Sequence, residues 1–346
     1  MTIALSVLDQ TPIRPGTTPA QAVADTIDLA KFVDRLGYTR YWVAEHHSTI
    51  AYAGPAPEIL IGKLASETRG IRVGSGGVML MHYSPFKVAE QFRMLETLYP
   101  GRIDLGIGRA PGGDGKSIVA LGSGQRANDI EETFPHTLDL LIRYLEDAGG
   151  SHETGIPQNS ILHGLVAQPM GNTFPEVWLL GSGIHSAVYA ATLGQAFCHA
   201  YFINPENAAE VARIYRERFE PSARLRRPRF ALAVSALAAD TEEDAQRLSL
   251  VRDLWVLNLL KGIHGAFPSP AEAAQYPLTD EDRLRLRAIR ARGHVGTPDQ
   301  VKTRLAALAG EFGAEELLLV TITHDHDARK NSYELLAKEF ALQPRL

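Results

Sequence analysis

The sequence predicts an α/β fold built on a (β/α)8 TIM barrel, with insertions at the C-terminal face of the strands. Three observations support this prediction. Eight short apolar runs resemble buried strands, amphipathic helical patterns separate most of them, and several runs end in polar or glycine-rich segments. Such a barrel needs roughly 250 residues, so a chain of 346 leaves a surplus for insertions. Because periodicity does not give strand order, a doubly wound sheet stays open as the alternative.

The strand-like runs are rich in valine, isoleucine, leucine and aromatic residues, and they are too short to be helices that bury an apolar face. Their near-continuous apolar character is typical of parallel strands covered on both faces. We expect them at residues 3–8, 41–44, 71–74, 103–107, 177–180, 196–199, 230–237 and 317–322.

The helical segments have apolar residues that recur close to every 3.6 positions. The first, residues 20–36, is followed by Gly37, which fits a C-cap. Several others begin near a proline, where the missing N–H is harmless. We expect helices at residues 20–36, 57–68, 85–98, 130–145, 186–193, 205–219, 242–260, 298–312 and 331–340.

No linker or internal repeat divides the chain, so we expect a single domain over residues 1–346. The surplus beyond the barrel framework falls in three stretches that lack the alternating pattern. These predicted insertions cover residues 110–129, 149–172 and 262–292. Since loops at the strand ends carry the specificity of barrel proteins, the insertions are where we expect the substrate to be selected.

Composition excludes several classes of function. The net charge of -5 argues against nucleic-acid binding and against docking on an anionic membrane, because both need a basic face. The single cysteine, Cys198, excludes an intrachain disulfide framework and a cysteine-rich metal site, and its apolar run predicts a buried packing residue. The N-terminal residues lack a signal-peptide pattern, and no apolar run reaches 18 residues. We therefore expect a soluble, cytoplasmic protein.

The segment after the second predicted strand is the most informative in the chain. Glu45, His46 and His47 directly follow its apolar residues, and the C-terminal ends of strands are where barrels build their sites. A neutral imidazole there suits acid–base work, because its ordinary pKa is about 6.5. Both histidines also fit satisfied interior positions. After the third strand, Gly76 and Gly77 fit either a tight turn or close backbone approach to a flat ligand.

The segment after the fifth predicted strand has the features of an anion site. Gly181 and Gly183 permit a tight turn, and the helix that follows would direct free N–H groups at a ligand. Ser182 and Ser186 add hydroxyl groups, and Arg109 from the neighbouring strand end would supply a positive charge. Phosphate is the expected guest. An ordinary helix with a capping serine is the alternative.

Other chemistry finds less support. Residues 324–327 alternate histidine and aspartate, but no second cluster accompanies them, so we expect no metal site and interpret them as a solvated rim with His324 facing the site. The strict G-x-G-x-x-G, P-loop, H-E-x-x-H and G-x-S-x-G motifs are all absent.

Taken together, these segments resemble the bacterial luciferase-like flavin monooxygenases over nearly the whole chain. No single piece is diagnostic, but the order and spacing of the pieces are highly specific. The segments that carry the resemblance are residues 42–47, 73–78, 84–91, 101–109, 181–187, 296–298 and 332–337.

The resemblance implies a TIM barrel that holds FMN at the C-terminal face of its strands. His46 matches the family's active-site histidine, and Gly76–Gly77 matches a non-prolyl cis peptide under the flavin ring. Arg109, Ser182 and Ser186 match the phosphate-binding positions. The full set of cofactor-binding residues we expect is Glu45, Ser75, Gly76, Gly77, Arg109, Gly181, Ser182, Gly183 and Ser186.

The implied reaction uses reduced FMN, supplied by a separate NAD(P)H:flavin reductase, and O2 to oxygenate a small organic substrate through a flavin hydroperoxide. The insertions at 110–129 and 262–292 are the expected lids, and a homodimer is the expected assembly. Gly181 stands where luciferase has an acidic residue, and Gly108 stands at its cysteine position, so light emission is not expected. Two alternatives stay open: a deazaflavin-dependent dehydrogenase on the same barrel and a non-catalytic flavin-binding protein.

Overall fold

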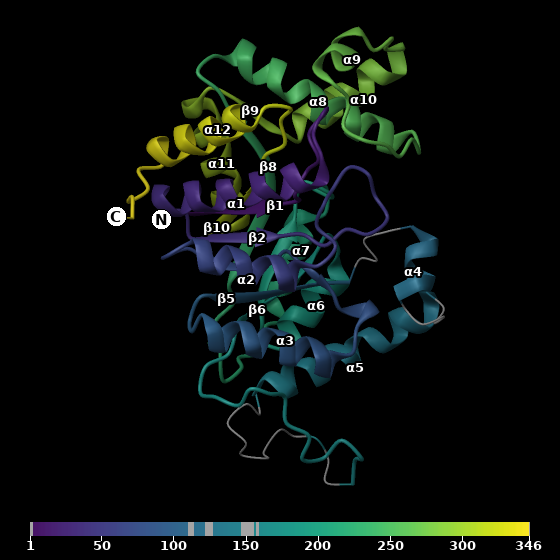
Figure 1. Cartoon of the computed structure of the whole chain (residues 1–346), viewed down its shortest axis with the longest axis vertical. Coiled ribbons are helices and arrows are strands. Elements are labelled where there is room, and N and C mark those ends of the chain that lie inside the picture. The colour runs from purple at the N-terminus through teal and green to yellow at the C-terminus, as the bar shows by residue number, and fades with distance from the viewer. Residues whose placement is uncertain (1–2, 110–113, 122–126, 147–155, 157–158, 346) are drawn as a thin grey trace.

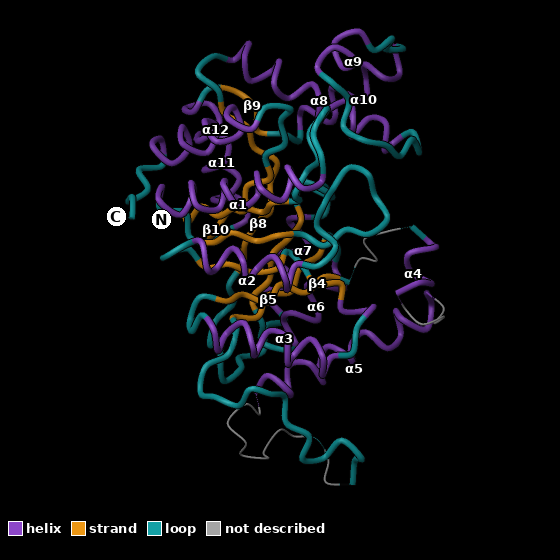
Figure 2. The backbone as a smooth tube through the Cα atoms, in the orientation of Figure 1, coloured by secondary structure: helices purple, strands orange, loops and turns teal. Residues whose placement is uncertain are grey.

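The structure, a computed structural model, describes residues 3–109, 114–121, 127–146, 156 and 159–345. Its centre is a parallel barrel enclosed by helices, seen as orange strands within purple helices in Figure 2. All eight predicted strands are present. They are β1 (Ala4–Asp9), β2 (Arg40–Val43), β3 (Arg72–Ser75), β5 (Ile103–Gly108), β6 (Glu176–Gly181), β7 (Ala196–Ala200), β8 (Phe230–Ala238) and β10 (Glu316–Val320).

The sheet closes on itself through β10. This strand pairs in parallel with β1, where Leu5 lies opposite Leu317, and also with β8, where Leu317 lies opposite Leu232. The remaining strands follow in chain order from β1 to β8. An open doubly wound sheet has two edges, so this closure excludes that alternative and confirms the (β/α)8 barrel.

Two short strands were not predicted. β4 (Val78–Met79) resumes the direction of β3 after Gly76 and Gly77, and it pairs with the end of β5. β9 (His294–Gly296) pairs with the end of β8. Segments of two or three residues have no resolvable periodicity, so their pairing comes from the neighbouring long strand.

All nine predicted helices are present, and three have the predicted bounds. The largest differences are at starts: α5 begins three residues earlier and α7 three residues later than predicted. α12 begins five residues earlier, because the Asp325 side chain caps it by accepting from the Ala328 amide, 2.8 Å away. The helices are α1 (Pro19–Leu36), α2 (Pro57–Glu67), α3 (Pro85–Leu98), α5 (Ala127–Glu146), α6 (Ile184–Thr192), α7 (Ala208–Glu217), α8 (Glu242–Leu260), α11 (Pro298–Phe312) and α12 (His326–Glu339).

The predicted insertions contain helices that the sequence pattern did not resolve. α4 (Gly115–Leu121) falls within 110–129, of which residues 110–113 and 122–126 lie outside the described residues. Of the second predicted insertion, residues 149–155, 157 and 158 also lie outside them. α9 (Pro270–Gln275) and α10 (Asp280–Ala291) fall within 262–292 and stand beside α8 at one corner of the molecule (Figure 1). Each begins with a capping box, at Ser269 and at Thr279.

The N-terminal half of the barrel interior is ionic. Arg40 is 1% exposed and lies 2.6 Å from Asp104 and 2.6 Å from Glu316. The indole N–H of Trp42 donates to Asp104 at 2.9 Å, so the network is hydrogen-bonded as well as charged. Buried ion pairs therefore occupy this half of the barrel interior. None of the described helices is both long and apolar enough to cross a membrane.

Candidate functional site

A cavity of about 630 Å³ opens at the C-terminal ends of the barrel strands. Segments that follow β1, β2, β3, β5, β6 and β7 contribute to its wall, as expected for a TIM barrel site. Nine predicted site residues line it. They are Glu45, His46, Gly76, Gly77, Arg109, Gly181, Ser182, Gly183 and Ser186.

One end of the cavity is suited to an anion. Helix α6 begins at Ile184 with Gly183 as its N-cap, and no side chain caps it, so its first N–H groups remain available to a ligand. Ser186 is buried in the first turn and lines the cavity with Ser182. Arg109, after β5, faces the same space.

The turn before α6 depends on glycine and on two asparagines. A Cβ at position 181 would collide with the Ser186 hydroxyl, so only glycine lets strand and helix approach this closely. The side-chain amides of Asn204 and Asn207 donate to the carbonyl oxygen of Ser182, at 3.2 and 3.0 Å. These asparagines hold the turn in place and were not predicted, because they follow the next strand and only folding brings them here.

The middle of the cavity has a flat, apolar floor. The Gly76–Gly77 peptide bond is cis, as the resemblance implied. A Cβ on Gly77 would lie 2.8 Å from the Gly106 carbonyl oxygen and 2.8 Å from the Leu180 side chain, so no larger residue fits. Cys198 is buried beneath this space, and burial raises the pKa of its thiol. Its predicted role as a packing residue is confirmed.

Two contacts fix His46, one through its backbone and one through its ring. Its backbone N–H donates to the Gly54 carbonyl at 2.9 Å, and its imidazole stacks on Tyr52 with ring centroids 4.4 Å apart. Nδ1 is buried and has no hydrogen-bond partner among the described residues. Burial, with a smaller contribution from His47, lowers the pKa of His46 to about 4. The imidazole is therefore neutral near pH 7.

Glu45 fixes the turn that presents His46. One carboxylate oxygen accepts from the Tyr83 hydroxyl at 2.6 Å and lies 2.6 Å from His47 Nε2. The other oxygen accepts from the backbone N–H of Met79 at 2.9 Å. Glu45 thus joins the segment after β2 to the segment after β3, and His47 takes part in this support and does not line the cavity.

Two residues that we expected in the site, Ser75 and His324, do not line the cavity. The hydroxyl of Ser75 donates to the Gly106 carbonyl at 2.8 Å, and Ser75 does not line the cavity, so its side chain joins β3 to β5. His324 lines a separate hollow with Asp240, Asp244 and Arg247, away from the main cavity, so the prediction that it faces the site is wrong. Within the described ranges no group of histidine, cysteine and acidic side chains has an arrangement that would hold a metal ion.

Sequence reasoning missed the aromatic cluster that supports His46. Tyr52 meets Trp255 and Phe267 edge-on, at centroid distances of 5.5 and 5.7 Å. Trp255 belongs to α8 and Phe267 to the segment before α9, so the cluster ties the third insertion to the site. Gln10, which lines the cavity and accepts from the Tyr52 hydroxyl at 3.3 Å, was missed as well. Its only sequence signal is a polar residue directly after a strand.

The arrangement combines an anion-binding end, a flat apolar floor and a neutral imidazole in one cavity. An elongated ligand with a phosphate at one end and a flat ring system at the other would match these features. The apolar floor would exclude water from the ring, while the buried imidazole would accept or donate one hydrogen bond. The residues present therefore fit a flavin mononucleotide.

Known proteins resemble this chain in both sequence and structure. The sequence matches the family described as luciferase-like monooxygenase over residues 2–316. It is 42% identical to the Bacillus subtilis (strain 168) protein YceB, covering 98% of this chain and 99% of that protein. It is 35% identical to N-acetyl-S-alkylcysteine monooxygenase of the same strain, covering 97% of each. The structure of apo-MsnO8 matches with a TM-score of 0.89 at 40% identity, covering 99% of both chains.

More distant solved structures share the fold alone. The oxygenating constituent of 3,6-diketocamphane monooxygenase, in complex with FMN, has a TM-score of 0.70 at 21% identity and covers 99% of this chain and 100% of its own. An F420-dependent secondary alcohol dehydrogenase has a TM-score of 0.70 at 14% identity, covering 98% and 99%. With the whole-length match to the family and to its members, the chain belongs to the luciferase-like monooxygenases.

Proposed function

We propose that this protein is a monooxygenase that uses reduced FMN and O2 to oxygenate a small organic substrate. The observation that carries the proposal is the cavity itself, which joins an uncapped helix N-terminus and Arg109 at one end to an apolar floor and a neutral His46 at the other. The FMN-bound neighbour of the same fold supports this choice of cofactor.

Each end of the cavity would hold a different part of FMN. Arg109, the hydroxyls of Ser182 and Ser186 and the first N–H groups of α6 would bind the phosphate, because all are donors to an anion. Gly76 and Gly77 would lie against the ring, where the absence of side chains permits close approach. Reduced FMN supplies the two electrons that activate O2.

His46 would handle the proton of the reaction. Because burial keeps its imidazole neutral near pH 7, the ring can accept a proton or a hydrogen bond from a bound group. Glu45 and Tyr52 hold the ring in place from two sides, through the turn and through stacking. A fixed neutral imidazole is suited to proton transfer in a site that excludes bulk water.

Anaerobic titration with photoreduced FMN, followed by rapid mixing with oxygenated buffer, tests the proposal. We expect stoichiometric binding, and flavin reoxidation slower than that of free reduced FMN, because the apolar floor shields the ring. Added substrate should then convert peroxide release into oxygenated product. Binding with reoxidation as fast as free flavin would contradict the monooxygenase proposal and favour a flavin-binding protein.

The same titration separates the deazaflavin alternative. A protein that binds deazaflavin in preference to FMN, and transfers hydride to a substrate without consuming O2, would be a dehydrogenase. One solved structure of this fold is F420-dependent, which shows that the barrel accommodates such a cofactor. Measuring O2 consumption with an oxygen electrode therefore distinguishes a monooxygenase from a dehydrogenase.

The proposal also includes a partner reductase, a dimeric assembly and a cytoplasmic location. A separate NAD(P)H:flavin reductase would supply reduced FMN, which this protein would bind as a cosubstrate. A homodimer fits the exposed apolar side chains of Ile59, Met94 and Leu98 on α2 and α3, which are 74%, 50% and 59% exposed. Cys198 as the single cysteine fits the reducing cytoplasm.

A further inference from the structure

Gln10 places a hydrogen-bonding group in the cavity that the binding of FMN phosphate does not use. It follows β1 directly and lines the cavity that His46 also lines. Tyr52 contacts both residues, through its hydroxyl to Gln10 and through its ring to His46. The carboxamide and the imidazole therefore belong to one wall, and both are supported by the same phenol.

The hydroxyl of Tyr52 binds one atom of the Gln10 carboxamide. It donates to Gln10 Oε1 at 3.3 Å. Tyr52 is 8% exposed, and burial raises the pKa of its phenol, so the hydroxyl keeps its proton and stays a donor. Gln10 Nε2 has no hydrogen-bond partner within the described ranges, which leaves an N–H donor for a ligand.

The rest of this wall offers little for a charged substrate. The ionisable side chains that line the cavity, within the described residues, are Glu45, His46, Arg109 and the buried thiol of Cys198. Glu45 already has three partners, His46 is neutral and Arg109 lies at the anion-binding end. The other lining side chains near the barrel centre are apolar, including Leu8, Trp42, Phe202 and Ala233.

We propose that Gln10 determines specificity by donating a hydrogen bond from Nε2 to a neutral acceptor, a carbonyl oxygen, on an otherwise apolar substrate. Tyr52 acts as a positioning residue that holds the carboxamide in this orientation. The inference rests on the proposed function for the presence of a substrate in this cavity. It adds the substrate class, a small uncharged carbonyl compound whose apolar part lies on the cavity floor.

A matched pair of probes tests this assignment by binding, without turnover. Cyclohexanone and methylenecyclohexane have nearly the same shape, but only the ketone has an acceptor oxygen. Each is titrated into the protein saturated with oxidised FMN and followed by calorimetry. One net hydrogen bond corresponds to roughly tenfold in affinity, so we expect the ketone to bind about tenfold more tightly than the methylene compound.

Three variants complete the test. Gln10→Leu should bring the ratio of the two affinities to about one, while Tyr52→Phe should lower it by weakening the orientation of the amide. Gln275→Leu, on an exposed position of α9, should leave the ratio unchanged. Equal binding of the two probes, binding of neither, or a tenfold preference that survives in Gln10→Leu overturns the proposal.

Failure of the Gln10 assignment can be distinguished from failure of the proposed monooxygenase function. If FMN does not bind, or binds without slowing its reoxidation, the monooxygenase proposal fails. The ketone titration is then repeated on the protein without flavin, where the Gln10→Leu comparison still gives a result. If FMN binds and O2 is activated but the ketone preference is absent, the monooxygenase stands and the assignment of Gln10 falls.

Discussion

At the scale of single residues, the site depends on a histidine that the protein keeps neutral. Burial lowers the pKa of His46, because a charged imidazole is less stable away from water. Stacking on Tyr52 contributes to this burial by covering one face of the ring. The lowered pKa makes His46 available as a proton acceptor over a wider range of pH than an ordinary histidine would be.

The first prediction concerns His46→Gln. The amide is polar and similar in size, but it does not exchange a proton near pH 7, so we expect turnover to fall by 10²–10⁴-fold. FMN affinity should change by less than threefold, because the phosphate end of the cavity is untouched. Product formation and fluorescence titration measure the two effects. His324→Gln, away from the cavity, is the control, and full turnover in His46→Gln would refute the role.

The pH dependence of wild-type turnover follows from the same residue. His46 has a pKa of about 4 in the folded protein, so lowering the pH toward 4 protonates it and removes the acceptor. We expect turnover to decrease on the acid side of a pKa near 4 and to show no step between pH 6 and 7 from this group. A kcat profile whose acid limb lies at pH 6.5 would contradict the burial of His46.

A further residue-scale prediction concerns Gly181→Ala. The added Cβ collides with the Ser186 hydroxyl, so the turn before α6 must shift and its N–H groups lose their alignment. We expect FMN affinity to fall by at least tenfold, as measured by fluorescence titration. Gly310→Ala in α11 meets open space and should leave FMN affinity as in the wild type. Equal affinities in the two variants would show that this turn does not hold the phosphate.

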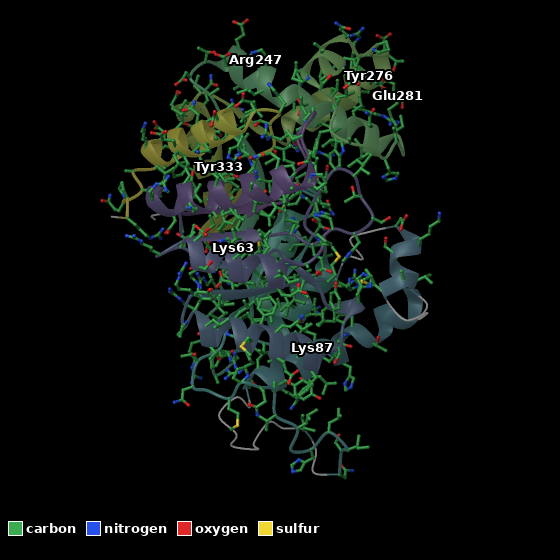
Figure 3. All side chains as sticks on the ribbon, viewed as in Figure 1. Lys63, Lys87, Arg247, Tyr276, Glu281 and Tyr333 are labelled. Atoms are coloured by element: carbon green, nitrogen blue, oxygen red, sulfur yellow. The ribbon has the colours of Figure 1, made fainter. Side chains whose placement is uncertain are left out.

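At the scale of elements, the insertion that carries α9 and α10 is joined to the barrel by aromatic packing. Trp255 and Phe267 lie with ring centroids 4.8 Å apart, and both meet Tyr52. Tyr276 and Glu281 mark the outer part of this unit in Figure 3, on the side of the molecule that α8 occupies. The unit therefore supports the wall of the cavity from outside.

Phe267→Ala tests this connection. Phe267 is 4% exposed, and removing a buried phenyl ring costs about 3–5 kcal/mol of unfolding free energy, as urea denaturation would show. We also expect more peroxide release per turnover, because Tyr52 loses one of the rings that support it. Leu284→Ala on α10, where the side chain is 61% exposed, should change the free energy by less than about 0.5 kcal/mol. Unchanged peroxide release in a destabilised Phe267→Ala protein would limit the cluster to a structural role.

At the scale of the whole molecule, the barrel is held by buried ion pairs as well as by its apolar core. Asp9 on β1 meets Arg329 on α12 at 2.7 Å and accepts hydrogen bonds from Tyr41 and Thr26. Burial alone would raise the pKa of Asp9, but the charge of Arg329 and these hydrogen bonds outweigh it and lower the pKa. The first and last elements of the chain are thereby joined.

This pair predicts how stability depends on acid. Because the pKa of Asp9 is lower in the folded than in the unfolded chain, the stabilisation is fully present above the ordinary value of 3.8 and is lost as the pH falls through the folded-state value. We expect the urea midpoint of the wild type to decrease below pH 4. An Asp9→Asn protein should be less stable at pH 7 and should lose less on acidification. Parallel acid curves for the two proteins would contradict this assignment.

Whether an element or a site residue could be predicted from the sequence depends on whether its signal is local. The eight barrel strands and nine helices could be predicted because each has its own apolar pattern, and residues 45–46, 76–77 and 181–186 could be placed because each ends a strand. β4, β9 and α4 are too short to have a pattern of their own. Asn204, Asn207 and Tyr52 carry no local signal, and Gln10 has only that of a polar residue directly after a strand. Their roles arise from neighbours distant in sequence.

The sequence by itself determined the alternation of strands and helices, the resemblance to the family and the residues that end the strands, because these depend on local patterns and their order. The tertiary structure decided that the sheet closes through β10, that Ser75 points into the sheet and that His324 lies in another hollow. It also decided that His46 is neutral and that Gln10 lines the cavity with its Oε1 bound by the Tyr52 hydroxyl. Closure, burial and the orientation of a side chain depend on contacts between segments far apart in the chain, and only the folded protein brings those segments together.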